Sequence, residues 1–210
     1  MWVAMEATTK IVPVIQLGPD TLEMAYAVVH ELQKRMQPGL ALPIFSSDGL
    51  RLYSYALTAH FGCWISPDGG RKRLWQLAAD FIYGQVKKLQ RRRRLVKVER
   101  VVLCGSFEVL ANRLKAVGLS GRLNTAFVER LNLTLRQGLA ALTRRSAAIA
   151  KTKRHLQLRL GSYLVYYNLV REHLSLGTSP ACAAGLTDHG WSWAEVLSYR
   201  LPPASLMGTM

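Results

Sequence analysis

Three acidic side chains stand where a carboxylate could hold a metal ion. Glu6 ends the apolar run WVAM, Asp48 comes after the apolar run LPIF, and Glu129 lies in an otherwise basic stretch. Carboxylates in such positions suit two-metal phosphoryl transfer, in which two Mg²⁺ ions about 4 Å apart activate the attacking oxygen and stabilise the leaving oxygen. Mg²⁺ prefers carboxylate oxygens and keeps several waters, so a few acids on open strand ends suffice. The chain has 13 acidic residues, however, and spacing alone does not single out these three.

Each acid also has an ordinary structural alternative. Asp48 precedes Gly49, and Asp-Gly is a common turn dipeptide. Glu129 could be a solvated helix acid that pairs with neighbouring arginines, an interaction that contributes little when exposed. At the helical period, Glu129 points away from the apolar stripe that contains Leu131 and Leu135. The residues by themselves therefore leave open both a metal site and a set of unrelated surface acids.

The charge of the chain predicts a polyanionic partner. Lys and Arg number 28 against 13 acids, which gives a formal net charge of +15. The basic residues are mostly arginines spread along the chain and are not gathered on one amphipathic helix, which favours nucleic acid over a membrane. No apolar run approaches the roughly 18 residues of a membrane span, so we expect a soluble protein with no membrane partner. The alternative is a basic protein with no polyanionic partner.

Strands and helices must position these acids, and the spacing of apolar residues along the chain predicts where those elements lie. Residues 2–6 and 10–17 are expected to be strands, and residues 21–36 a helix with Asp20 as N-cap and Glu23 completing a capping box. The run LALPIFS is expected to be a strand, followed by a helix over about 50–61. This alternation predicts an α/β domain with helices packed on a sheet.

The second half of the chain is expected to contain further strands and then helices. Residues 62–73 are expected to be loop, and residues 74–104 a pair of strands with the basic connection KKLQRRRR. Helices are predicted over 107–118, 123–145 and 152–169, with Gly138 a weak point of the second. A short last helix should begin near Ser192, whose spacing to Glu195 is that of a capping box, and the tail from Pro202 should be frayed.

Four stretches resemble bacterial insertion-sequence transposases of the DDE class. GRLNTAFVERLNLTLRQGLAALTRRS resembles the helix that carries their third acid, and YYNLVREHLSL resembles the segment that follows it. FSSDGLRLYSYALTAHFG is similar to the segment around the second acid, and WVAMEATTKIVPVIQLGP to the first catalytic strand and its hairpin partner. The resemblance extends from Trp2 to about Arg200 and is most specific around Glu129 and in residues 166–176.

The resemblance implies a ribonuclease-H-like core at residues 1–176, with a mixed five-stranded sheet flanked by helices, and a C-terminal loop and short helix at 177–210. It implies cleavage and joining of DNA strands with Mg²⁺ or Mn²⁺ held by Glu6, Asp48 and Glu129. The partner would be double-stranded DNA, at transposon ends and target, in the cytoplasm at the nucleoid, and a homo-oligomer on the DNA is compatible with this. Supporting residues would be Asn168, Arg171 and His173. The residues expected to contact DNA phosphates are Arg91, Arg92, Arg93, Arg94, Arg130 and Arg136.

The sequence departs from the family pattern at two important places. The family has Asp where this chain has Glu6, and the extra methylene could misplace a metal that needs sub-ångström positioning. The chain also begins five residues before Glu6, without the DNA-binding region expected there; Glu172 replaces a usual Pro. One hypothesis is therefore a truncated transposase with little or no activity alone, and its alternative is a non-catalytic DNA-binding remnant. A more distant alternative is a nuclease that acts on RNA:DNA hybrids.

Overall fold

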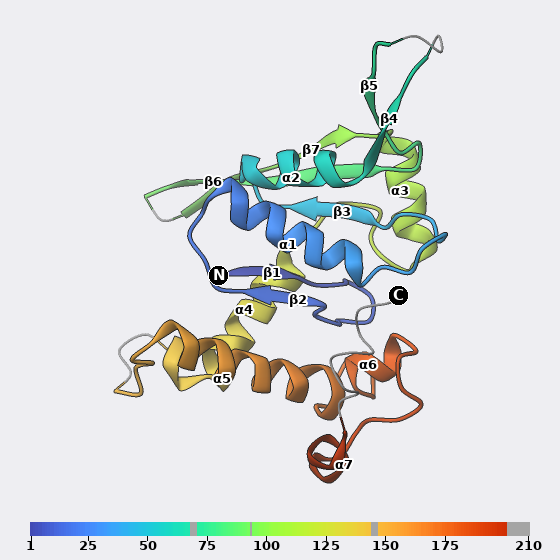
Figure 1. Ribbon diagram of the computed structural model, residues 1–210. Coiled ribbons are helices and arrows are strands. Elements are labelled where there is room, and N and C mark those ends of the chain that lie inside the picture. The colour runs from blue at the N-terminus through green and yellow to red at the C-terminus, as the bar shows by residue number, and fades with distance from the viewer. Residues whose placement is uncertain (68–70, 93, 144–146, 201–210) are drawn as a thin grey trace.

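The computed structural model describes residues 1–67, 71–92, 94–143 and 147–200, and they form a mixed α/β fold (Figure 1). The elements in chain order are β1 (Trp2–Ala4), β2 (Val14–Gln16), α1 (Leu22–Lys34), β3 (Ile44–Ser47), α2 (Arg51–His60), β4 (Gly62–Ile65), β5 (Leu74–Leu77), β6 (Ile82–Arg91), β7 (Arg94–Cys104), α3 (Phe107–Ala116), α4 (Ala126–Gly138), η1 (Ala140–Leu142), α5 (Lys153–Val165), η2 (Tyr166–Val170), α6 (Pro180–Ala183) and α7 (Trp193–Ser198).

The described strands form three separate sheets. β3 pairs in parallel with β6, and β6 pairs antiparallel with β7. β1 and β2 form an antiparallel pair, and β4 and β5 form a hairpin that projects from the body in Figure 1. Because β1 is hydrogen-bonded only to β2 and β3 only to β6, these strands do not make the single five-stranded sheet that the resemblance implies. β1 and β3 run in opposite directions across the molecule (Figure 1).

Buried apolar side chains join the two larger groups of strands through the helices. One cluster packs α1 and α2 against both β1 and β3, through residues such as Trp2, Val29 and Phe45. A second cluster joins α4 and α5 to the β1–β2 hairpin through Leu131, Leu135 and Leu160. A third places α3 on the β6–β7 hairpin. Removal of this apolar surface from water is the main favourable term for the arrangement, and it brings helices to both faces of β6.

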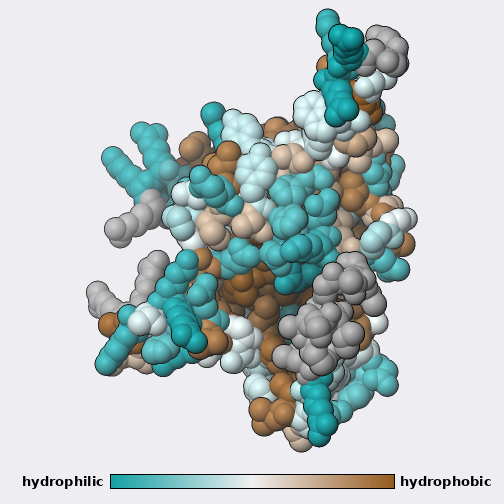
Figure 2. Space-filling model, viewed as in Figure 1, coloured by the Kyte–Doolittle hydropathy of each residue, from teal (hydrophilic) through white to brown (hydrophobic). Residues whose placement is uncertain are grey.

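The β6–β7 hairpin continues beyond this core. The first half of β6, up to Val86, is buried, and the second half, from Lys87, is exposed. Figure 1 shows the far end of the hairpin extending away from the helices, and Figure 2 shows hydrophilic side chains gathered over it. A pair of strands in this region is confirmed, over Ile82–Arg91 and Arg94–Cys104. The expected first strand from Leu74 is divided between β5 and β6, and the expected connection KKLQRRRR is wrong in its first half, which continues β6.

Several expected element boundaries were wrong. The first long helix is capped by Thr21, which accepts a hydrogen bond from the amide of Met24 at 3.4 Å, and not by Asp20. Residues 62–65 are a strand and not loop, because Trp64 pairs across the hairpin with Trp75 at 5.4 Å between ring centroids. The strand expected over 10–17 is shortened to Val14–Gln16, since Lys10 has a φ of 63° and Pro13 has no N–H to donate.

The C-terminal part of the chain also differs in detail from expectation. The helix expected over 123–145 ends at Gly138, where a Cβ would overlap the ring of Tyr163. The expected loop after residue 177 contains α6, whose N-cap Ser179 accepts from the amide of Cys182. The capping box of Ser192 and Glu195 is confirmed at the start of α7. The tail expected to fray from Pro202 lies outside the described residues, as do residues 144 and 145 of the expected helix.

No helix in the described part of the chain combines the length and the apolar character needed to cross a bilayer.

Candidate functional site

The structure brings Glu129, and the glycine that follows Asp48, to consecutive residues of β6. Gly49, the neighbour of Asp48, lies against Lys87, so that a Cβ on this glycine would be 3.3 Å from the lysine Cγ. Glu129, in the first turn of α4, forms an ion pair with Lys88. Side chains of consecutive strand residues point to opposite faces, so Lys88 and Glu129 lie on one face of β6, and the Lys87 side chain that Gly49 contacts lies on the other.

Asp48 follows β3 in a tight turn into α2. One of its carboxylate oxygens, Oδ1, accepts a hydrogen bond from the amide of Leu50 at 3.1 Å. This is the turn role that the Asp-Gly pair suggested. The other oxygen, Oδ2, has no hydrogen-bond partner in the described part of the structure, and the side chain is exposed. Asp48 therefore keeps one free carboxylate oxygen that could bind a cation, while its first oxygen holds the turn.

One carboxylate oxygen of Glu129 accepts hydrogen bonds, and the other has no partner among the described residues. Its Oε1 accepts from the ammonium of Lys88 and from the hydroxyl of Thr125, the latter at 2.8 Å. The hydrogen bond from Lys88 is the main reason why the pKa of this carboxyl lies below its ordinary value, and the bond from Thr125 adds to the effect. The side chain is 53% exposed, so its ion pair contributes little to stability. Oε2 has no partner among the described residues, which leaves it available to a cation.

Both carboxylate oxygens of Glu6 accept hydrogen bonds, unlike those of Asp48 and Glu129. It follows β1 and folds back on its own turn, where Oε1 accepts from the amide of Thr8 at 2.9 Å and Oε2 from the amide of Thr9 at 2.6 Å. The hydroxyls of the same two threonines also donate to it. Burial raises the pKa of this carboxyl, but the hydrogen bonds lower it by more, so the net pKa lies below its ordinary value.

Glu6 also lies apart from Asp48. It comes after the last residue of β1 and Asp48 comes after the last residue of β3, and these strands end at opposite sides of the molecule in Figure 1. Among the described residues, no group of three or more His, Cys, Asp and Glu side chains could hold a metal ion. The structure therefore does not gather Glu6, Asp48 and Glu129 into one three-acid group, and the expected metal site stays a prediction.

The donor set of Asp48 and Glu129 fits a cation that is shared with a phosphate. Mg²⁺ is commonly bound through one or two carboxylates together with substrate phosphate oxygens and waters. One turn beyond Glu129 on α4, Oδ1 of Asn132 is buried without a hydrogen-bond partner among the described residues. Asp48 and Glu129 thus each keep one carboxylate oxygen that could bind Mg²⁺ or Mn²⁺, and the metal site stays a prediction.

The arginines expected to contact phosphates lie on exposed surface, at the far end of the β6–β7 hairpin and on α4. Arg91, Arg92 and Arg94 form the tip of the β6–β7 hairpin, and Arg93 lies outside the described residues. Arg130 and Arg136 are exposed on α4. The five described arginines have no acidic partner in the described part of the structure. Their charge is therefore available to an external anion.

The three expected supporting residues follow α5, and each contacts neighbouring residues of the fold. Asn168, in the π-helical turn η2, accepts from the amide of Val12 and donates to its carbonyl, both at 3.0 Å. Arg171 lies over the ring of Tyr167. Burial lowers the pKa of His173, and the charges of Arg171, Lys10 and Arg130 lower it further, which favours the neutral imidazole. Of the three, Asn168 has the clearest role, because it ties η2 to the connection between β1 and β2.

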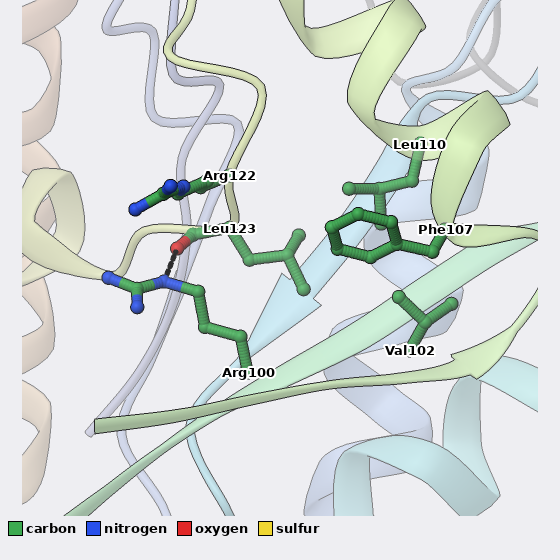
Figure 3. Close-up of a pocket in the computed structure, with 6 residues that line it drawn as sticks. All are labelled: Arg100, Val102, Phe107, Leu110, Arg122 and Leu123. Atoms are coloured by element: carbon green, nitrogen blue, oxygen red, sulfur yellow. Dashed lines mark hydrogen bonds between the residues drawn. The ribbon is translucent and has the colours of Figure 1, made fainter. Parts of the chain in front are cut away.

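The sequence analysis did not single out the cavity in Figure 3. It has a volume of about 300 Å³ and lies between β7, α3 and the segment before α4. Its lining residues are Arg100, Val102, Phe107, Leu110, Arg122 and Leu123. These residues come from β7, from the start of α3 and from the segment before α4, and no motif in the sequence marks them.

Comparison of the chain with protein-family models, with curated proteins and with solved structures gives no match. The geometry of the site and the resemblance of the quoted stretches therefore carry the functional argument.

Proposed function

We propose that this chain is a transposase-type core that binds double-stranded DNA and contributes Asp48 and Glu129 to a metal-dependent phosphoryl-transfer site. The observation that carries the proposal is that the turn after Asp48 contacts Lys87 and that Glu129 pairs with Lys88, at the base of a projecting basic hairpin. The resemblance assigns Asp48 and Glu129 to the second and third acids.

The proposed fold is ribonuclease-H-like. The parallel pairing of β3 with β6, the antiparallel pairs on either side, and helices on both faces of β6 support it. The two sheets share one apolar core although β1 and β3 are not hydrogen-bonded to each other. In the proposed fold, the β1–β2 sheet and the β3–β6–β7 sheet correspond to two parts of one sheet.

In the proposed site, some residues would bind DNA phosphates and others would position the two acids. The hairpin arginines hold phosphates of the backbone without reading sequence. Lys88 and Thr125 keep Glu129 ionised and oriented, with its second oxygen free. The turn at Gly49 keeps one oxygen of Asp48 engaged and one free. When bound, Mg²⁺ or Mn²⁺ would supply activation of the attacking oxygen and stabilisation of the leaving oxygen.

A second function, DNA binding without chemistry, is favoured by the position of Glu6. Its carboxylate oxygens are engaged by Thr8 and Thr9, and among the described residues no group of three acids could hold a metal ion. With two acids alone, a cation is held weakly, and cleavage by the isolated chain is not expected. The two functions share the DNA contacts and differ only in metal-dependent cleavage.

Calorimetric titration with millimolar Mn²⁺, in the presence of a DNA duplex, tests the metal site. We expect binding by the chain and loss of binding in Asp48→Asn and in Glu129→Gln. Asp188→Asn, which changes an exposed acid near α7, is the matched control and should bind as the parent does. If both site variants bind Mn²⁺ normally, the metal site is refuted. Cleavage of duplex, and of an RNA:DNA hybrid, by the same samples then separates the catalytic function from DNA binding alone.

The salt dependence of duplex binding tests the DNA contacts independently. Each phosphate contact contributes a slope of about −0.9 in log affinity against log salt concentration. Replacing Arg91 and Arg94 together by alanine should therefore reduce the slope by about 2 and weaken binding to all sequences alike. The control is Arg159→Ala on the exposed side of α5. An unchanged slope in the hairpin variant would show that the hairpin does not contact the backbone.

A further inference from the structure

We propose that the cavity between β7, α3 and the segment before α4 binds a single nucleotide, with its base on the apolar wall and its phosphate between Arg100 and Arg122. The inference rests on the proposed DNA binding and adds to it a site for one unstacked base. It predicts a preference for DNA with an unpaired nucleotide, which the phosphate contacts alone do not predict.

The register of the β6–β7 hairpin builds the floor of the cavity. Val102 lies opposite Gly84, and Arg100 lies opposite Val86, so all four share one face of the hairpin. Gly84 has no side chain, and a Cβ there would overlap Leu123 and come within 2.9 Å of the carbonyl oxygen of Val101. The glycine therefore lets Leu123 settle against the strand as a wall of the cavity.

The apolar wall offers an aromatic ring that the core does not use. Phe107, the first residue of α3, is 63% exposed, whereas its neighbour in the cavity, Leu110, is buried. Figure 3 shows Phe107, Leu110 and Val102 together on one side of the cavity. A flat ring on a rigid apolar floor suits a stacked base, since base–aromatic stacking works for every base.

The basic wall of the cavity consists of Arg100 and Arg122, and neither has an acidic partner among the described residues. Nε of Arg100 donates to the carbonyl of Leu123 at 2.8 Å, which fixes the direction of this guanidinium. The terminal nitrogens of Arg100 and the guanidinium of Arg122 have no partner among the described residues. In Figure 3 both guanidinium groups lie on the side of Leu123 away from Phe107. Paired arginine forks suit a phosphate, and the opposite apolar wall suits the attached base.

The cavity lies next to the candidate metal site. On the same face of the hairpin, the pair Val86 and Arg100 is followed toward the tip by Lys88 and Val98. Lys88 holds Glu129, so a nucleotide bound in the cavity would place its neighbouring phosphate near that carboxylate. A base must leave the stack to enter, which costs a few kcal/mol in a paired duplex and less where it is unpaired. The cavity would thus select distorted or single-stranded DNA near the site.

Competition binding with two duplexes tests the inference. One carries a single unpaired thymine, and the other has an abasic residue at the same position. The full chain should bind the unpaired base about 10-fold more tightly than the abasic residue, the scale set by base–aromatic stacking. Phe107→Ala should abolish this preference and keep the affinity for the abasic duplex. Arg122→Ala should weaken the binding of both duplexes, because both keep the phosphate at this position.

Matched controls separate the cavity from the general DNA contacts. Leu158→Ala removes an exposed apolar side chain of α5, and Arg159→Ala an exposed charge beside it; both should keep the preference. Thermal unfolding verifies that Phe107→Ala is folded, and Phe107→Leu serves as a second, milder variant. If the parent chain binds both duplexes equally, or if Phe107→Ala keeps the preference, the nucleotide site is overturned. Failure to bind either duplex would instead overturn the proposed DNA binding.

Discussion

Replacing Glu6 by Gln distinguishes a structural carboxylate from a metal ligand. In the structure, each carboxylate oxygen of Glu6 accepts from the amide and the hydroxyl of one threonine, Oε1 from Thr8 and Oε2 from Thr9. Gln keeps the size of the side chain but has one acceptor oxygen in place of two. Its NH₂ group would face the amide N–H of one threonine, donor against donor, and that amide would lose its partner.

The size of the effect follows from the hydrogen bond that is lost. A partly buried amide donor left without an acceptor costs about 1–3 kcal/mol, so we expect the free energy of unfolding to fall by about 2 kcal/mol. For a chain of this length, about 1 kcal/mol corresponds to about 2–4 °C in Tm, so the Tm should fall by about 4–8 °C. The control Glu172→Gln, an exposed acid, should change stability by less than about 0.5 kcal/mol.

The pH dependence gives a second signature. The pKa of Glu6 in the folded chain lies below its ordinary value of 4.5, because the threonine hydrogen bonds outweigh the effect of burial. The unfolded chain therefore binds more protons in this range, and the contribution of Glu6 to stability is present above that ordinary value. It is lost as the pH falls through the lower folded-state pKa. The difference in Tm between the parent and Glu6→Gln should shrink over the same range.

Thermal unfolding at neutral and acidic pH, together with Mn²⁺ calorimetry, measures both expectations. We expect lower stability and unchanged Mn²⁺ binding in Glu6→Gln. If stability is unchanged and Mn²⁺ binding is lost, Glu6 is a metal ligand, and the inference drawn from its hydrogen bonds is wrong.

Three further substitutions test the packing that positions the site. Gly84→Ala should lower the free energy of unfolding by about 1–3 kcal/mol, because its Cβ overlaps Leu123; chemical denaturation measures this. Gly161→Ala is its opposite, since a Cβ there meets nothing within 4 Å in the middle of α5, and it should raise stability by about 0.5–1 kcal/mol in the same assay. Asn168→Ala leaves the amide and carbonyl of Val12, which is 1% exposed, without their partners, and should cost about 1–3 kcal/mol. A loss below 0.5 kcal/mol would show that η2 does not hold this connection.

Much of the local structure could be predicted because its causes are local. The helix over Leu22–Lys34 and the helix after Asp48 follow from apolar periodicity and flanking turns. The capping box at Ser192 needs only its own four residues. The strand Gly62–Ile65 was missed because its evidence is the pairing of Trp64 with Trp75, which are separated by a turn in the sequence. Which strands share a sheet was likewise not predictable from pattern alone.

The sequence by itself determined the strong positive charge, the order of most elements and the basic character of the far end of the long hairpin. These properties depend on composition and on neighbours within a few residues. The tertiary structure decided that the turn after Asp48 and the carboxylate of Glu129 lie against neighbouring lysines of β6, that Glu6 turns to its own threonines, and that Arg100 and Arg122 share a cavity with Phe107. These contacts depend on how helices and strands far apart in the chain bury their apolar faces together, which no local pattern specifies.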